Sequence, residues 1–197
     1  MALSLGAEGV SHLEGGQWEG TVAYRYLYAD RGVVGDRFDP TYASTIGARI
    51  AIHSFDLQIT YAFTRRYSAT LTMPFVYASG SDFRQHEDDG IHRHTTSAGG
   101  LGDLRLVGNA WLLDPEKHAD GNFSLGIGVK APTGDEKATD TFYKRTGPEI
   151  RPVDIAIQPG DGGWGIELEL VGYQKVFERL YGYVAGFYLQ KGIFFPP

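Results

Sequence analysis

The fold is decided by residues 99–135, GGLGDLRLVGNAWLLDPEKHADGNFSLGIGVKAPTGD. Two segments of this stretch alternate between an apolar row and a row of small or polar side chains, and a polar turn separates them. A period of two is the repeat of a β-strand, so the stretch predicts a hairpin with one apolar face. The apolar rows of the two arms are Leu104, Leu106, Gly108, Ala110 and Leu112, then Phe123, Leu125, Ile127, Val129 and Ala131.

Such alternation fits two classes of β-protein. A soluble sandwich or barrel turns its apolar row inward, whereas a membrane barrel turns that row to lipid and keeps small, polar and charged side chains inside. In this hairpin the apolar row is unbroken in each arm, and each arm approaches the roughly 9–11 residues that a tilted strand needs to cross a bilayer. Both features favour the membrane class.

The same period of two predicts five further strands, at 18–28, 54–63, 68–78, 164–171 and 181–189. Ile50 and Ile52 lie in the opposite phase from the strand that follows them, which predicts either a loop or a β-bulge near His53. Pro74 cannot donate a ladder hydrogen bond, so it predicts a bulge or a locally unpaired site within its strand. The predicted apolar face of the last strand is Tyr181, Tyr183, Ala185, Phe187 and Leu189.

The connections between these seven strands alternate in length. Long loops are predicted at 30–45, 79–98 and 132–163, and short ones at 64–67, 114–122 and 177–180. Up-and-down barrels of the outer membrane show this alternation, because their short turns collect on the periplasmic side and their long loops outside. A soluble Greek-key sandwich has no reason to alternate. The sequence therefore predicts an all-β chain that forms an antiparallel up-and-down transmembrane β-barrel, with residues 1–197 in a single domain.

Composition and charge argue against several other classes of protein. The formal net charge is -6 and no cluster of Lys and Arg is present, so a nucleic-acid partner is not expected. The chain has no cysteine, and therefore no disulfide framework or thiolate metal site. No run approaches the roughly 18 apolar residues of a transmembrane helix, a criterion that does not apply to barrels. Neither a catalytic triad nor a nucleotide-binding motif is visible, so the sequence predicts no enzyme and no cofactor.

Three glycine-rich stretches carry a resemblance to a known family. They are GLGDLRLVGNAWLLD at 100–114, GNFSLGIGVKAPTGD at 121–135 and GDGGWGIELELVGYQKVFERLYGYVAGFY at 160–188. With them the chain resembles the bacterial outer-membrane barrels of the phenol-degradation meta-pathway family, in which such motifs recur in this order. The resemblance covers about half of the chain, from Gly99 onward. It implies an outer-membrane location and passage of aromatic compounds.

The charged residues of the polar rows are the candidate lumen-lining residues: Arg25, Asp56, Asp103, Arg105, Lys130, Glu167 and Glu169. All but the first two lie near the loop end of neighbouring strands. There they either line a constriction that selects solutes or pair with one another across the strands. We expect pairing, because Arg105 and Lys130 would otherwise repel each other.

One loop contains candidate metal ligands. The segment RQHEDDGIHRH, residues 84–94, places His86, His92 and His94 beside three carboxylates. In an extended segment His92 and His94 would point the same way and, with His86 or Glu87, could bind a divalent metal. We expect a solvated loop instead of a metal site, because a metal site needs a fixed geometry.

These features together predict an outer-membrane channel or transporter component for small solutes, including aromatic or hydrophobic ones, with the lipid bilayer as its partner. The alternatives are a soluble β-barrel that binds an apolar ligand in its interior, and an envelope enzyme with its chemistry in the loops. Seven strands is an odd number, whereas bacterial single-chain membrane barrels have even numbers. Residues 1–10 also lack the basic start and apolar core of a signal peptide. The sequence is therefore expected to be part of a larger barrel; it does not specify the solute or the oligomeric state.

Overall fold

The computed structural model describes residues 13–39, 47–82 and 92–191 of the 197-residue chain, and these residues are all-β apart from one 3₁₀ turn, η1 (Ile155–Ile157). The main sheet consists of β1 (Trp18–Ala29), β4 (Arg49–Ala62), β5 (Tyr67–Asp82), β6 (His94–Leu101), β7 (Leu104–Trp111), β8 (Gly121–Ala131), β11 (Gly165–Phe177) and β12 (Leu180–Lys191). Two small hairpins pair β2 (Val33–Val34) with β3 (Arg37–Phe38), and β9 (Thr139–Lys144) with β10 (Gly147–Pro152).

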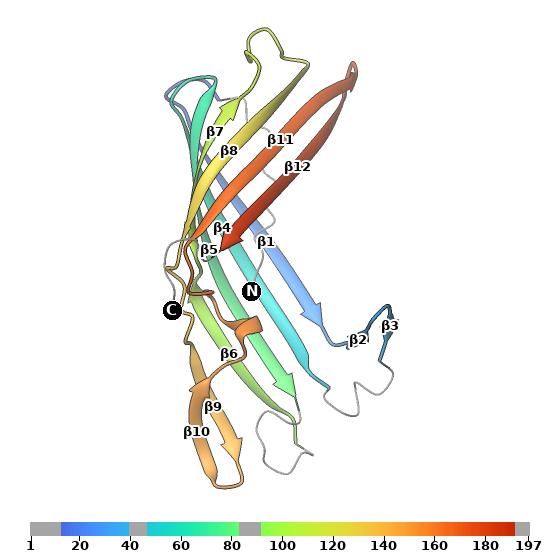
Figure 1. Ribbon diagram of the computed structural model, residues 1–197, viewed down its shortest axis with the longest axis vertical. Coiled ribbons are helices and arrows are strands. Elements are labelled where there is room, and N and C mark those ends of the chain that lie inside the picture. The colour runs from blue at the N-terminus through green and yellow to red at the C-terminus, as the bar shows by residue number, and fades with distance from the viewer. Residues whose placement is uncertain (1–12, 40–46, 83–91, 192–197) are drawn as a thin grey trace.

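The main sheet is an antiparallel meander that curves into a half-barrel (Figure 1). Its strand order is β1-β4-β5-β7-β8-β11-β12, and β6 pairs with β5 beyond the end of β7. Each strand lies beside its predecessor in the sheet, so the predicted up-and-down order is confirmed. The short turns lie at one end of the sheet and the long connections at the other, also as predicted (Figure 1). In the described part of the chain, β1 and β12 form the two open edges of the sheet.

The strands β6 and β7 form one line that is interrupted by a β-bulge opposite Pro74. On one side of the bulge Phe75 pairs with Leu101, and on the other side Thr72 pairs with Arg105. Two residues of β5 therefore face three residues of the neighbouring line, 102–104, and the extra residue inverts the phase of alternation between β6 and β7. At this break the Gly102 amide donates to the Pro74 carbonyl, at 2.7 Å. The irregularity that Pro74 predicted is present.

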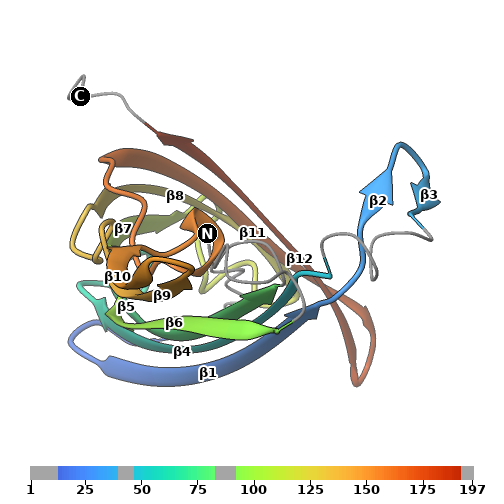
Figure 2. The ribbon, with the colours of Figure 1, turned by 90° about the horizontal axis from the view of Figure 1, so that it is seen from below.

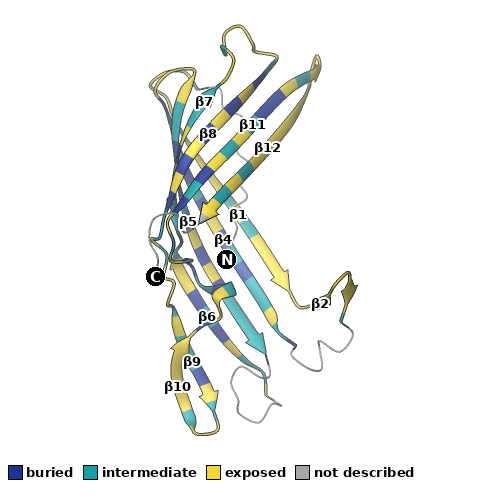
Figure 3. Ribbon diagram, viewed as in Figure 1, coloured by how far each residue is buried: buried dark blue, intermediate teal, exposed yellow. Residues whose placement is uncertain are grey.

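The burial pattern of the sheet is the reverse of that of a soluble β-protein. The row that faces the inside of the curve is polar and buried; among its members, Asp56, Lys130 and Glu167 are at most 4% exposed. The row on the outside is apolar and exposed, with Ile127 64% exposed and Leu106 50% exposed. Figure 3 shows the two classes alternating along each central strand. We call these rows the concave and the convex face.

The prediction of a bulge near His53 is wrong. The strand β4 pairs without a register shift with both β1 and β5, so Ile50 and Ile52 continue the concave row of Ser54 and Asp56. Their side chains are apolar because the long loop after β8 packs on them: Ile52 belongs to a buried cluster with Val76, Ala78, Ala98, Val153 and Ile157. The concave row of β4 therefore changes from polar to apolar at Ile52 because the loop after β8 covers that part of the face.

All three predicted long loops contain secondary structure, and the first, 30–45, contains the small hairpin of β2 and β3. Within 79–98 the chain continues β5 to Asp82 and resumes as β6 at His94, and within 132–163 it forms β9, β10 and η1. These segments carry too many small and polar residues for a clear alternation, since much of β6 is Thr, Ser and Gly. The sixth predicted strand also extends further, to Phe177 in β11.

The face assignment of the last strand is also wrong. Residues that pair directly across two antiparallel strands share a face. Leu189 pairs with the buried Glu167, and Tyr183 pairs with Tyr173. The row of β12 with Tyr181, Tyr183, Ala185, Phe187 and Leu189 is therefore on the concave side. Val184 and Tyr188 are on the convex side. At this edge the concave face is aromatic.

Candidate functional site

The seven charged residues predicted to line a lumen lie on the concave side of the half-barrel. Arg25 and Asp56 come from β1 and β4, while Arg105, Lys130 and the pair Glu167 and Glu169 come from β7, β8 and β11. Asp103 lies in the bulge between β6 and β7. The structure thus divides the predicted set into one group on β1 and β4 and a second group near the bulge.

The second group is centred on Lys130. Its ammonium donates to Asp103 Oδ2 at 2.8 Å and also contacts Asp161 Oδ1. The Lys130 side chain is 5% exposed, so this charge is compensated by two carboxylates away from bulk water. Asp161 was not among the predicted residues. A sequence signal for it exists, because Gly160–Asp161 repeats the Gly–Asp pair of the bulge.

Backbone amides of two glycine-rich segments converge on Asp103, which lies in the third. The Gly134 amide donates to Asp103 Oδ1 at 3.0 Å, and the Asp161 amide donates to Oδ2 at 3.3 Å. Glycine is needed at this junction, because a Cβ atom on Gly160 would lie 2.4 Å from the backbone of Gly134. The three motifs that carried the family resemblance therefore meet at one point of the structure, which we call the Asp103 node (Asp103, Lys130, Asp161 and Gly134).

Beside this node, Arg105 pairs with Glu167. The two side chains are 8% and 0% exposed, and Arg105 Nη1 lies 2.5 Å from Glu167 Oε1. They belong to β7 and β11, which are separated by β8, so the pair spans an intervening strand. On β8 the residue paired with Glu167 is Gly128, which has no side chain on the concave face; a Cβ atom there would lie 2.7 Å from the Leu106 carbonyl oxygen. The predicted cross-strand pairing is present.

In the group on β1 and β4, Arg25 and Asp56 form an ion pair. Arg25 donates to Asp56 Oδ2 through Nη2 at 2.9 Å and through Nε at 3.2 Å. The Asp56 side chain is 4% exposed and that of Arg25 28%. A guanidinium that donates twice to one carboxylate has a fixed orientation, so this pair holds a charged group of each sign on the wall of the half-barrel.

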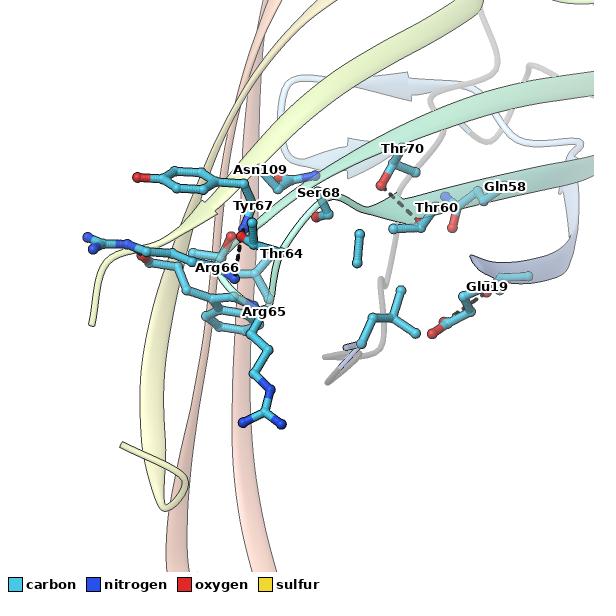
Figure 4. A pocket seen from close by; sticks show the side chains of 16 residues that line it. Glu19, Gln58, Thr60, Thr64, Arg65, Arg66, Tyr67, Ser68, Thr70 and Asn109 are labelled. Atoms are coloured by element: carbon cyan, nitrogen blue, oxygen red, sulfur yellow. Dashed lines mark hydrogen bonds between the residues drawn. The ribbon is translucent and has the colours of Figure 1, made fainter. Parts of the chain in front are cut away.

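Toward the short turns, the concave face is lined by hydroxyl and amide groups. A pocket of about 80 Å³ lies there, and Thr60, Thr70 and Asn109 are on its wall (Figure 4). The hydroxyls of Thr60 and Thr70 are 3.0 Å apart, within hydrogen-bonding distance. At the turn itself Arg65 contacts Glu14 and Glu116; the hydrogen bond with Glu14 is the main cause that raises the pKa of this guanidinium above its ordinary value.

A second pocket, of about 340 Å³, lies at the same end and contains tyrosines that the sequence analysis did not place on this face. Tyr173 of β11 and Tyr181 and Tyr183 of β12 line it, together with Arg65. Tyr173 donates from its hydroxyl to the His118 carbonyl at 3.1 Å. The tight β11–β12 turn alone does not reveal them, because Phe177 pairs with Leu180 there and only a register shift between Lys175 and Phe177 puts both strands' odd-numbered residues on the face of Glu167.

The histidine-rich loop is only partly described. His86 lies outside the described residues. His94 begins β6 and stacks on Tyr143 with ring centroids 5.0 Å apart, while His92 is exposed in the segment before it. Among the residues that the structure describes, no group of three potential metal ligands is close enough to hold an ion. Within the described residues, His92 and His94 therefore belong to no such group.

Comparison of the chain with models of known families finds no match, and comparison with curated proteins finds none either. Within 13–39, 47–82 and 92–191, no helix has the length and apolar character needed to cross a bilayer. The resemblance of the glycine-rich motifs to the phenol-degradation meta-pathway barrels therefore remains an expectation from the sequence.

Proposed function

We propose that the chain forms part of an outer-membrane β-barrel and acts as a passive channel or a transporter component for small solutes. The observation that carries the proposal is the reversed burial of the sheet. Lys130 and Glu167 are buried on the concave side, whereas Phe55, Ile127 and Leu168 are 51%, 64% and 43% exposed on the convex side. Such a face is unfavourable in water and favourable in lipid.

Aromatic side chains on the convex face support a position in a bilayer. One group lies near the short turns, where Trp18 and Tyr61 have ring centroids 4.5 Å apart. A second group lies further along the strands, where His53 is within 4.8 Å of Tyr26 and within 6.4 Å of Tyr77, measured between ring centroids. Two bands of amphipathic rings, separated along the strands by residues such as Leu57 and Leu71, are typical of the two interfaces of a membrane barrel.

The concave face supports passage of polar or small solutes through a hydrated interior. Its hydroxyls, amides and paired charges are groups that water and solutes can exchange hydrogen bonds with. The tyrosines of β11 and β12 add an aromatic wall at one edge, in keeping with the aromatic or hydrophobic solutes that the family resemblance implies. A soluble barrel that binds an apolar ligand would instead be expected to have an apolar interior and a polar exterior.

The proposal is tested by the cellular location of the full-length protein. Bacterial envelopes are separated into soluble, inner-membrane and outer-membrane fractions, and the outer-membrane fraction is washed with alkaline carbonate. We expect the protein in that fraction and resistant to the wash, because its convex face is buried in lipid. Recovery in the soluble fraction would contradict the proposal and favour the soluble barrel.

A matched pair of substitutions sharpens this test. Ile127→Arg puts a charge on the convex face, at a cost of about 2–4 kcal/mol if the site lies near the bilayer midplane. Asn109→Arg puts the same charge on the concave face, where water is expected. The first variant should be lost from the outer-membrane fraction and the second retained; equal retention of both would contradict the face assignment.

A further inference from the structure

Apart from its aromatic edge on β12, the concave face has an apolar region toward the long loops, where the wall of a channel would be expected to be polar. Ile52, Val76, Ala78 and Ala98 form it, on the parts of β4, β5 and β6 that lie toward the long loops. They are at most 8% exposed. Apolar side chains of this kind are buried on the concave side of the sheet only if something covers them.

The cover is a segment of the long loop between β8 and β11, residues 153–160, which we call the strap. Val153 and Ile157 of the strap are 4% and 1% exposed and complete the apolar cluster. Ile157 lies against Gly80 of β5; a Cβ atom on this glycine would be 3.6 Å from Ile157 Cδ1. Figure 2 shows the segment that contains η1 lying within the curve of the sheet.

The strap is fixed at both of its ends. At its start the Val153 amide donates to the Ala138 carbonyl at 2.9 Å. At its end the Gly160 amide donates to the Asp135 carbonyl at 3.2 Å, and the next residue, Asp161, joins Lys130 and Asp103 in the Asp103 node. Between these ends Asp154 accepts from the Ala156 amide at 2.8 Å and so begins the 3₁₀ turn.

We propose that the strap is a fixed constriction that sets the size limit for solutes, so that Ile157, by holding the strap on the wall, is a specificity-determining residue. This inference rests on the proposed function as a channel. The strap occupies space inside the curve of the sheet at its loop end, and the charges beside it are paired, so they offer little selection by sign. Size is then the property on which the constriction discriminates.

The test compares two isoleucines of the same 3₁₀ turn. Ile157 is 1% exposed and rests on the wall, whereas Ile155 is 73% exposed, so Ile155→Ser is a matched control for Ile157→Ser. The full-length protein and each variant are reconstituted in phospholipid vesicles, and the rate of swelling is measured with neutral sugars of increasing size. We expect Ile157→Ser to admit sugars that the parent excludes, and Ile155→Ser to keep the size limit of the parent.

A second measurement separates a fixed constriction from a moving gate. The chain has no cysteine, so Gly80→Cys with Ile157→Cys provides the only two thiols of its 197 residues, and a short bifunctional reagent can join them. Once the reagent joins the strap to the wall, the size limit should be that of the parent; a block of small sugars that the parent admits would show a gate and overturn the proposal. An unchanged size limit in Ile157→Ser would also overturn it while the channel function stands. Absence of swelling with the parent protein would overturn both.

Discussion

At the scale of single residues, the concave face is organised by buried ion pairs whose partners come from different strands. Arg105 with Glu167 is the most buried of these pairs, with side-chain exposures of 8% and 0%. Removing one member of such a pair leaves the other charge without compensation in a site of low polarity. The loss of folding stability is therefore much greater than the net stability that the intact pair contributes.

Substitution of Arg105 by Ala should therefore destabilise the folded protein by about 3–5 kcal/mol. The measurement is the urea midpoint of unfolding in lipid vesicles, followed by tryptophan fluorescence. A control is Arg65→Ala, which removes an exposed arginine from its contacts with Glu14 and Glu116 and should change the midpoint much less. Equal effects of the two substitutions would contradict a buried role for Arg105.

The same residue is expected to influence the passage of ions. The concave face carries Arg25, Arg105, Lys130 and Lys175 against Glu19, Asp56, Asp103, Asp161, Glu167 and Glu169. Four basic groups stand against six acidic ones, so the parent should prefer cations only weakly. Arg105→Ala should shift the reversal potential in a planar bilayer toward cations. Strong anion preference of the parent, abolished by this substitution, would mean that Arg105 belongs to an anion-binding site.

At the scale of elements, β8 determines which side chains of its neighbours can meet. Gly126 and Gly128 lie on its concave face, and the side chains of β7 and β11 approach each other over them. The long charged side chains of β7 and β11 therefore require small residues on β8, the strand between them. The alternation of glycine in the sequence indicated a small face but not its purpose, which depends on strands that are remote in the chain.

A side chain at Gly128 should disrupt this arrangement. The Cβ atom of Gly128→Ala would lie 2.7 Å from the Leu106 carbonyl oxygen and 2.7 Å from Val107 Cγ2, so backbone has to move. Overpacking of this kind costs about 1–3 kcal/mol. Gly20→Ala in β1 is the control, because a Cβ atom there has no neighbour within 4 Å. The urea midpoint should fall for the first variant only; a fall for both would point to a general effect of losing glycine.

Local sequence signals predict some of these elements and not others. The central hairpin and the order of seven strands could be predicted, because alternation and turn residues are local signals. The concave placement of Tyr181 and Tyr183 could not be read from alternation, since an aromatic row is compatible with either face and only pairing with β11 decides. The face of Ile52 could not be predicted for a related reason: the strap, which covers it, is far away in the sequence.

At the scale of the whole molecule, the half-barrel has two open edges, β1 and β12, within its described residues. Unpaired backbone groups are not tolerated in the hydrocarbon region of a bilayer. A polypeptide of only these 197 residues is therefore not expected to migrate as a closed barrel, compact before boiling and extended after it, in a detergent gel. A heat-dependent shift of this kind would show that the two edges become paired within residues 1–197.

The central claim is that the convex face contacts lipid and the concave face contacts water. Because the chain lacks cysteine, single cysteines can be placed at Ile127 and Leu168 on the convex face, and at Thr60 and Asn109 on the concave face. Each full-length variant is labelled with the same fluorophore and reconstituted in vesicles, and quenching by iodide is compared with quenching by a lipid-attached nitroxide. The first two labels should be quenched by the nitroxide and the last two by iodide. Iodide quenching at Ile127 and Leu168, with protection at Thr60 and Asn109, would contradict the membrane barrel.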